Sequence, residues 1–154
     1  MAKKRILALD PGGTCGWSIW VGTELEEMGQ DPPAAFFKVL RRELERGERG
    51  ERGERGVDAV VYERYVLRAN ASRAMIGSEF EVVQVIGVVR YLCKEAGVVC
   101  IGQMPAQRTF FTDERLKEMG VYRRGAPHAL DSVRHGLYYL AFKEKVLDIS
   151  GYQA

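Results

Sequence analysis

Residues 4–21 read KRILALDPGGTCGWSIWV, and this stretch sets the start of the fold. Its first apolar run, over 4–9, predicts a buried strand that ends at Asp10. The Pro-Gly-Gly at 11–13 predicts a turn, because these residue types interrupt regular structure. Apolar and polar residues alternate over 16–21 and predict a second strand. The chain therefore opens with two strands and leaves a carboxylate at the end of the first.

The rest of the chain carries similar signals for seven further elements. They are a strand around 24–29, a helix after Pro32 and Pro33, a strand over 57–62 that ends at Glu63, a helix over 73–95, a strand over 98–104, a short helix capped by Thr112 and a last helix that begins at Pro127. Hairpin strands followed by strand–helix alternation predict an α/β fold, with a five-stranded mixed sheet and helices on both faces.

Length and composition bound the organisation of the chain. With 154 residues, 46% of them hydrophobic, we expect a single domain over 1–154 with a sizeable core. Residues 45–56 repeat Glu-Arg-Gly with period three. This run is too short and too poor in proline for a collagen helix, so we interpret it as an exposed insert. The net charge of +2 neither requires nor excludes a nucleic-acid partner.

The cysteines and the apolar runs give expectations about location. Cys15, Cys93 and Cys100 form no CxxC pair and have no histidine-rich surroundings, which argues against a disulfide framework or a zinc site. The chain passes into its first strand without an apolar signal segment. The longest apolar run, over 82–89, is too short to span a bilayer. We expect a cytoplasmic protein without membrane association.

Four candidate site residues stand where elements end or begin. Asp10 closes the first strand and Glu63 closes the fourth, while His128 and Asp131 lie three apart on one face of the last helix. If the first and fourth strands are neighbours, their carboxylates emerge side by side and the helix docks across them. Taken singly, each residue also suits a turn, a strand end or a helix cap. The combination is what predicts a site.

Such a cluster suits metal-dependent hydrolysis of a phosphodiester. Mg²⁺ prefers oxygen ligands and binds through one or two carboxylates together with phosphate oxygens and water. Two ions about 3.5–4 Å apart can activate the attacking water and stabilise the leaving oxygen. Without metal the carboxylates repel one another, so we expect perturbed pKa values among them.

Four segments resemble the RuvC family of Holliday junction resolvases. They are ILALDPGGTCGW at 6–17, VVYE at 60–63, NASRAMIG at 70–77 and HALD at 128–131. The resemblance spans roughly residues 4–142 and has all four site positions in order. It implies a ribonuclease H-like fold. It also implies a structure-selective DNA endonuclease that resolves four-way junctions by paired nicking, through two-metal-ion hydrolysis.

The resemblance also implies residue roles. Asp10, Glu63, His128 and Asp131 would be the catalytic residues and would hold two Mg²⁺ ions. His128 stands where many members have Asp, and imidazole is a softer ligand, so Mn²⁺ is the alternative. The Glu-Arg-Gly run is no family feature, and the segment 105–125 is shorter than usual and divergent. The compact chain suggests a phage-encoded resolvase that acts in the cytoplasm of a bacterial or phage-infected cell.

Basic and aromatic side chains between these motifs are candidates for contact with branched DNA. The candidate DNA-binding residues are Arg64, Tyr65, Arg68, Arg73, Arg108, Lys117, Arg123 and Arg124. Phosphate contacts would make binding salt-dependent. The Tyr65 ring would either stack on a base or pack against the sheet.

Paired cuts in a two-fold symmetric junction suit a C2 homodimer. The helix over 73–95 is apolar on more than one face, so it could pack on the sheet with one face and on a partner copy with the other. Burial of the whole helix within one domain is the alternative.

Three other functions remain open from the sequence. Asp10-Pro-Gly-Gly also resembles the first phosphate loop of actin-like ATPases, but those proteins need a second domain and a second glycine-rich loop. A catalytically silent nucleic-acid-binding protein on the same fold would not need the intact acid set. A nuclease for flaps, forks or other branched DNA would share the chemistry, because substrate choice depends on loops and dimer geometry.

Overall fold

The computed structural model describes residues 3–46, 56–66 and 78–152. Its strands are β1 (Arg5–Asp10), β2 (Cys15–Val21), β3 (Glu24–Asp31), β4 (Ala59–Glu63) and β5 (Val99–Gln103). Its α-helices are α1 (Pro33–Glu45), α2 (Ser78–Ala96), α3 (Asp113–Glu118) and α4 (Pro127–Tyr138). Shorter helical turns are η1 (Pro105–Phe110), η2 (Tyr139–Lys143) and η3 (Ser150–Tyr152). The predicted order of strands and helices is confirmed. Most of the Glu-Arg-Gly run and the start of the helix predicted over 73–95 lie outside the described residues.

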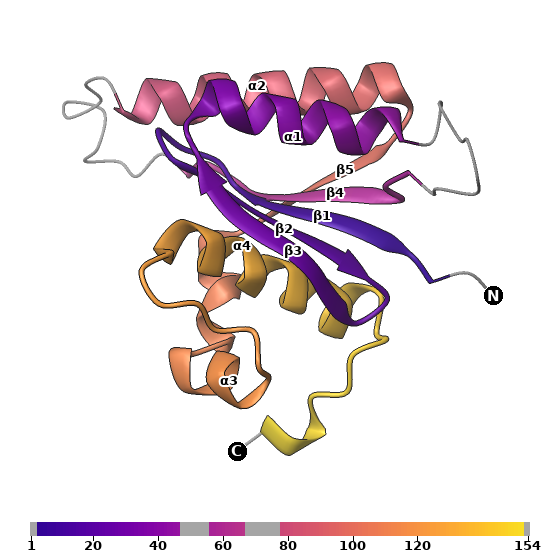
Figure 1. Cartoon of the computed structure of the whole chain (residues 1–154), viewed down its shortest axis with the longest axis vertical. Coiled ribbons are helices and arrows are strands. Elements are labelled where there is room, and N and C mark those ends of the chain that lie inside the picture. Colours follow the sequence, from indigo (N-terminus) through magenta and orange to yellow (C-terminus); the bar gives the residue numbers. More distant parts are fainter. Residues whose placement is uncertain (1–2, 47–55, 67–77, 153–154) are drawn as a thin grey trace.

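The five strands form one mixed sheet in the order β3-β2-β1-β4-β5. β1 pairs antiparallel with β2 and parallel with β4, and β5 pairs parallel with β4. β1 is therefore the central strand, with neighbours on both sides. Helices α1 and α2 cover one face of this sheet and α4 covers the other (Figure 1). The predicted fold class is confirmed.

The sheet separates two apolar cores. Successive side chains of a strand point to opposite faces, so Ile6 and Ala8 join the core under α4 while Leu7 and Leu9 join the core under α1 and α2. All four side chains are completely buried. This double burial explains why β1 reads as a continuous apolar run rather than an alternating one.

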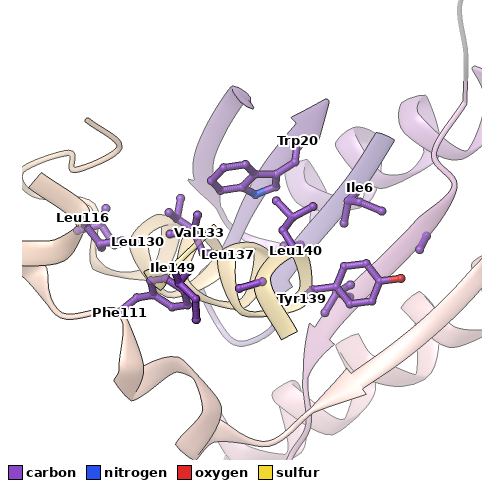
Figure 2. Close-up of a cluster of buried hydrophobic side chains, with 14 residues drawn as sticks. Ile6, Trp20, Phe111, Leu116, Leu130, Val133, Leu137, Tyr139, Leu140 and Ile149 are labelled. Carbon is purple, nitrogen blue, oxygen red and sulfur yellow. The ribbon is translucent and has the colours of Figure 1, made fainter. Parts of the chain in front are cut away.

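Helix α4 lies close against the sheet. Its apolar face, with Val133 and Leu137, packs around Trp20 of β2 (Figure 2). Two glycines permit the close approach: a Cβ on Gly16 of β2 would overlap the main-chain carbonyl of His128, and a Cβ on Gly136 of α4 would overlap the Trp20 ring. The start of α4 therefore lies against the start of β2.

The first turn of α4 is capped from another element. Pro127 occupies the first turn, where its missing N–H costs nothing. Ala126 at the N-cap offers no side-chain acceptor. Instead, Oε1 of Gln30 on β3 accepts from the backbone N–H groups of His128 at 3.1 Å and Ala129 at 3.3 Å. A distant strand therefore fixes the helix end that carries His128 and Asp131.

Within the part of the chain that the structure describes, helix α2 buries one apolar face and leaves apolar side chains exposed on another. Val85, Val89 and Cys93 are buried in the core that α2 shares with α1. Val83 and Tyr91 remain 44% and 61% exposed. Along the described residues, no helix combines the length and apolar character that crossing a membrane requires.

Candidate functional site

Asp10 and Glu63 end two neighbouring parallel strands. Leu9 of β1 is in register with Tyr62 of β4, so the next residue on each strand emerges at the same edge of the sheet. Both carboxyl groups are buried, with 8% of each residue exposed. The two carboxyls share a hydrogen bond. Two acidic side chains that are 53 residues apart in the chain thus meet beneath the surface.

This pair cannot be doubly ionised without a large energetic cost. Burial, followed by the hydrogen bond and the negative charge of Glu63, raises the pKa of Asp10 to about 9. Burial also opposes ionisation of Glu63, but the neighbouring His135, the hydrogen bond with Asp10 and the charge of Arg108 outweigh it and lower the pKa of Glu63. Asp10 is therefore protonated at neutral pH and Glu63 carries the charge.

The first turn of α4 brings the other two predicted site residues to this edge. Nδ1 of His128 lies 3.2 Å from Oδ2 of Asp10. The charge of Asp131 contributes to the raised pKa of Asp10, and one guanidinium group, that of Arg108, contacts both Asp131 and Glu63. The four residues singled out from the sequence are therefore neighbours in the fold.

Two arginines balance the carboxylates. Nη1 of Arg108, which belongs to η1, lies 2.5 Å from Oε1 of Glu63 and 3.7 Å from Oδ2 of Asp131. Nη1 of Arg134 donates to Oδ1 of Asp131 at 2.9 Å, and its Nη2 donates to Asp113. The Arg108 side chain is 36% exposed, so it bridges two site acids from the solvent side.

The sequence analysis missed three polar residues around the acids. His135 is completely buried, with Nε2 at 3.8 Å from Oε1 of Glu63. Gln103 at the end of β5 lies 3.0 Å from Nδ1 of this histidine, and Arg134 is described above. A signal for His135 was available: it stands seven residues after His128, so helical spacing places both histidines of the chain on one face of α4.

The predicted DNA-binding residues separate into two groups. Arg64, Tyr65 and Arg108 line a groove of about 430 Å³ that also contains Glu63. Three others do not line this groove. The Lys117 ammonium lies 4.7 Å from the Tyr122 ring centre, Arg123 donates to the carbonyl of Met28, and Arg124 is exposed. Arg68 and Arg73 lie outside the described residues. Of the described candidates, Arg108 is the one with a recorded contact to the site acids.

The donor chemistry fits a hard divalent cation, although the donors are engaged with each other. Three carboxylates and one imidazole meet at this edge, and oxygen donors are the preferred ligands of Mg²⁺. Among residues 3–46, 56–66 and 78–152, however, no group of three or more His, Cys, Asp or Glu side chains is arranged as a preformed metal site. Arg108, Arg134 and the Asp10 proton neutralise the acids instead. A cation would have to displace a proton and a guanidinium group.

Comparisons with known proteins identify the fold. No protein-family model matches the chain, and no curated protein matches its sequence. RuvC of Thermus thermophilus in complex with a Holliday junction substrate superposes with a TM-score of 0.62 at 17% identity, over 93% of this chain and 97% of that chain. A second Thermus thermophilus RuvC structure gives 0.56 at 19% identity, over 92% and 97%. YeaZ from Pseudomonas aeruginosa gives 0.46 at 17% identity, over 76% and 50%. The chain has the ribonuclease H-like fold of the RuvC structures.

Proposed function

We propose that this chain is a metal-dependent endonuclease that resolves four-way DNA junctions. The observation that carries the proposal is the meeting of Asp10, Glu63 and the first turn of α4 at one sheet edge. Clustering buried carboxylates disfavours the charged state, as the raised pKa of Asp10 indicates. Such an arrangement is expected where a site holds a ligand that the free protein lacks.

The bound ligand would be one or two Mg²⁺ ions, with Mn²⁺ as the alternative, held by Asp10, Glu63, His128 and Asp131. Cations bound there would neutralise charge on the scissile phosphate and lower the pKa of the attacking water. Asp10 must lose its proton for this, and the His128 imidazole, 3.2 Å from its carboxyl, is placed to accept it. His128 is half-exposed, so the proton can pass on to solvent.

Arg108 supplies the next part of the proposal. Its guanidinium bridges Glu63 and Asp131. When these acids take a cation, the guanidinium group is released into the groove that Arg64 and Tyr65 also line. A bidentate donor in that position suits a DNA phosphate. The same side chain would thus neutralise the acids in the free protein and the phosphate in the complex.

The homodimer belongs to the same proposal. Val83 and Tyr91 on α2 are exposed apolar side chains on the face that this chain leaves uncovered. A partner copy packed there would give two sites related by a two-fold axis, which paired nicking of a junction needs. Sedimentation of the wild type is expected to give a dimer at micromolar concentration, and a Val83→Asp, Tyr91→Asp variant a monomer. A monomeric wild type would remove this part of the proposal.

The deciding experiment compares DNA substrates. Wild-type protein with Mg²⁺ or Mn²⁺ is incubated with a synthetic four-way junction, a linear duplex of the same arm sequences, and a flap. We expect symmetric paired nicks in the junction and little cleavage of the duplex. Preferred cleavage of the flap would redirect the proposal to another branched substrate, and no cleavage of any DNA with either metal would refute it.

A further inference from the structure

A buried polar chain leads inward from Glu63, and its two inner members are not used by the function proposed above. It consists of Gln103 from the end of β5, His135 from α4, and Glu63 itself. His135 is 0% and Gln103 2% exposed. Glu63 and Gln103 are register partners on neighbouring parallel strands, and α4 packs across both. Three separate elements therefore fix these side chains relative to one another.

The contacts of Gln103 determine which histidine nitrogen carries the proton. Nε2 of Gln103 lies 3.1 Å from the main-chain oxygen of His135 and 3.0 Å from its Nδ1. A carbonyl oxygen accepts hydrogen bonds and donates none. The amide atom that faces it must therefore be the nitrogen, which fixes the orientation of the Gln103 side chain.

The second hydrogen of this amide then points to Nδ1 of His135. Because Nδ1 accepts, it carries no proton, and the imidazole proton must be on Nε2. Within the part of the chain that the structure describes, Nε2 of His135 is buried without a hydrogen-bond partner. It lies 3.8 Å from Oε1 of Glu63. The Gln103 amide thus directs an otherwise unused N–H toward Glu63.

The same Glu63 oxygen is held on its other side by Arg108, at 2.5 Å. The distance to His135 exceeds the roughly 2.7–3.2 Å of an N–H···O hydrogen bond, so Oε1 leans toward the guanidinium group. If Arg108 leaves for a phosphate, a shift of less than about 1 Å would bring Oε1 into hydrogen-bond range of Nε2. His135 can therefore donate a hydrogen bond to the Glu63 oxygen once Arg108 has released it.

We propose that His135 is a positioning residue for Glu63, and that Gln103 sets the tautomer it needs for this role. Once Arg108 releases Glu63, the pair would hold its carboxylate in one orientation, with Oε1 on the Nε2–H and the other oxygen available to a cation. The inference deepens the proposed metal site and rests on it. Groups behind metal ligands commonly act in this way, and their loss typically costs about 10–100-fold in metal affinity.

The first test measures the tautomer in the wild-type protein, without metal or DNA. Nitrogen–proton correlation NMR of the imidazole is expected to show His135 as the Nε2–H form, with a slowly exchanging proton whose resonance moves in Glu63→Gln. An Nδ1–H form, or an Nε2–H resonance unchanged in Glu63→Gln, would overturn the proposal. This readout needs neither metal binding nor cleavage.

The second test measures Mn²⁺ affinity by calorimetry. His135→Leu, which removes the donor, is expected to bind Mn²⁺ about 10–100-fold more weakly than wild type. His135→Gln, whose amide nitrogen can stand near the position of Nε2, should restore most of the affinity. Val133→Ala, another buried α4 position, is the control: it should lower the melting temperature without changing Mn²⁺ affinity.

The outcomes separate this inference from the proposed function. Folded His135→Leu with wild-type Mn²⁺ affinity would overturn the positioning role while leaving the metal site intact. If His135→Leu does not fold, Gln103→Met replaces it in the same titration, and unchanged affinity there would overturn the role of Gln103. A wild type that binds no Mn²⁺ would refute the proposed metal site, and the NMR result would still decide which nitrogen of His135 carries the proton.

Discussion

The two ends of strand β1 both carry a buried ionisable side chain, but charge is balanced differently at each end. At the start, Arg5 is enclosed with Nε at 3.0 Å from Glu43 and Nη1 at 2.6 Å from Glu26. Burial alone would lower the pKa of Arg5, and the two glutamates more than compensate and raise it. At the other end, Asp10 faces Glu63 and stays protonated, with a pKa of about 9.

The difference distinguishes a structural ion cluster from a candidate binding site. Near Arg5, two further arginines contact Glu43: Arg42, which also contacts Glu27, and Arg46. Every charge there has a protein partner. Around Asp10, balance depends on a proton and on Arg108, which is partly exposed and can leave. We therefore propose the second end, and not the first, as the site of an external cation.

The largest expected effect is on the rate of DNA cleavage, and only substitutions at the Asp10 end of β1 should cause it. Asp10→Asn and Glu63→Gln are expected to lower the junction-cleavage rate by more than about 100-fold, because loss of a proposed ligand should exceed the effect of losing a residue behind it. Glu43→Gln should leave the rate unchanged at temperatures where it is folded. Gel-based cleavage assays with junction binding measured in parallel test this, and equal losses in all three variants would erase the distinction.

The free energy of unfolding should show the opposite pattern, with a larger loss from a substitution at the Arg5 end of β1 than from one at the Asp10 end. Glu43→Gln leaves Arg5 buried with a single, half-exposed partner, Glu26. Removing one member of a buried ion pair typically costs about 3–5 kcal/mol, so urea unfolding should give a free energy of unfolding lower by about 3 kcal/mol. Glu63→Gln is the comparison variant and should lose less. A smaller loss in Glu43→Gln than in Glu63→Gln would show that the Arg5 cluster is not the structural one.

The pH dependence of the free energy of unfolding should show that ionisation is unfavourable at the Asp10 end of β1. The pKa of Asp10 is higher in the folded protein than in the unfolded chain, so the folded state binds its proton more tightly. The metal-free protein should therefore lose stability as the pH rises from about 4 toward 9. Glu63, with a lowered pKa, contributes stability that is lost only at acidic pH.

Asp10→Asn isolates this contribution, because asparagine cannot ionise. We expect the variant to be more stable than the metal-free wild type at pH 8, by at least the ~1.4 kcal/mol that one pKa unit represents. The two proteins should converge near pH 4. Thermal melts in chelator across this range measure the difference. Equal stability of both proteins at every pH would mean that Asp10 ionises without strain.

The smallest expected effect is on Mn²⁺ affinity, when the Arg108 guanidinium that bridges two site acids is removed. Arg108→Gln removes the positive group between Glu63 and Asp131, so a cation no longer has to displace it. Calorimetry should show Mn²⁺ binding tightened by up to about tenfold, or ~1.4 kcal/mol, while junction cleavage slows. Arg64→Gln, which lines the same groove, is the matched control and should leave Mn²⁺ affinity unchanged. Weaker Mn²⁺ binding in Arg108→Gln would contradict the displacement account.

The strands and the placement of the acids followed from local sequence patterns. Asp10 and Glu63 each end a buried apolar run, and carboxyl ends of parallel neighbours meet at one edge of a sheet. The spacing of His128 and Asp131 placed both on one helix face. The strand ends and the helix face need only periodicity, which the printed sequence carries; the adjacency of β1 and β4 was an assumption that the sheet order confirms.

Tertiary contacts between distant segments could not be predicted in this way. The cap that Gln30 provides for α4 joins residues 98 and 99 positions apart. The bridge from Arg108 depends on the η1 turn after β5, and no periodic pattern in residues 105–110 predicts that turn. His135 is different, because its helical spacing from His128 was visible in the sequence although the residue was not singled out.

The most direct test of the central claim is anomalous diffraction from crystals of the protein soaked in Mn²⁺. The account predicts an anomalous peak among the carboxylates of Asp10, Glu63 and Asp131, with the Arg108 guanidinium moved away from Glu63. The peak should be absent in Asp10→Asn crystals treated identically. Soaked wild-type crystals with no manganese at this edge of the sheet, and with Arg108 still bridging Glu63 and Asp131, would contradict the account.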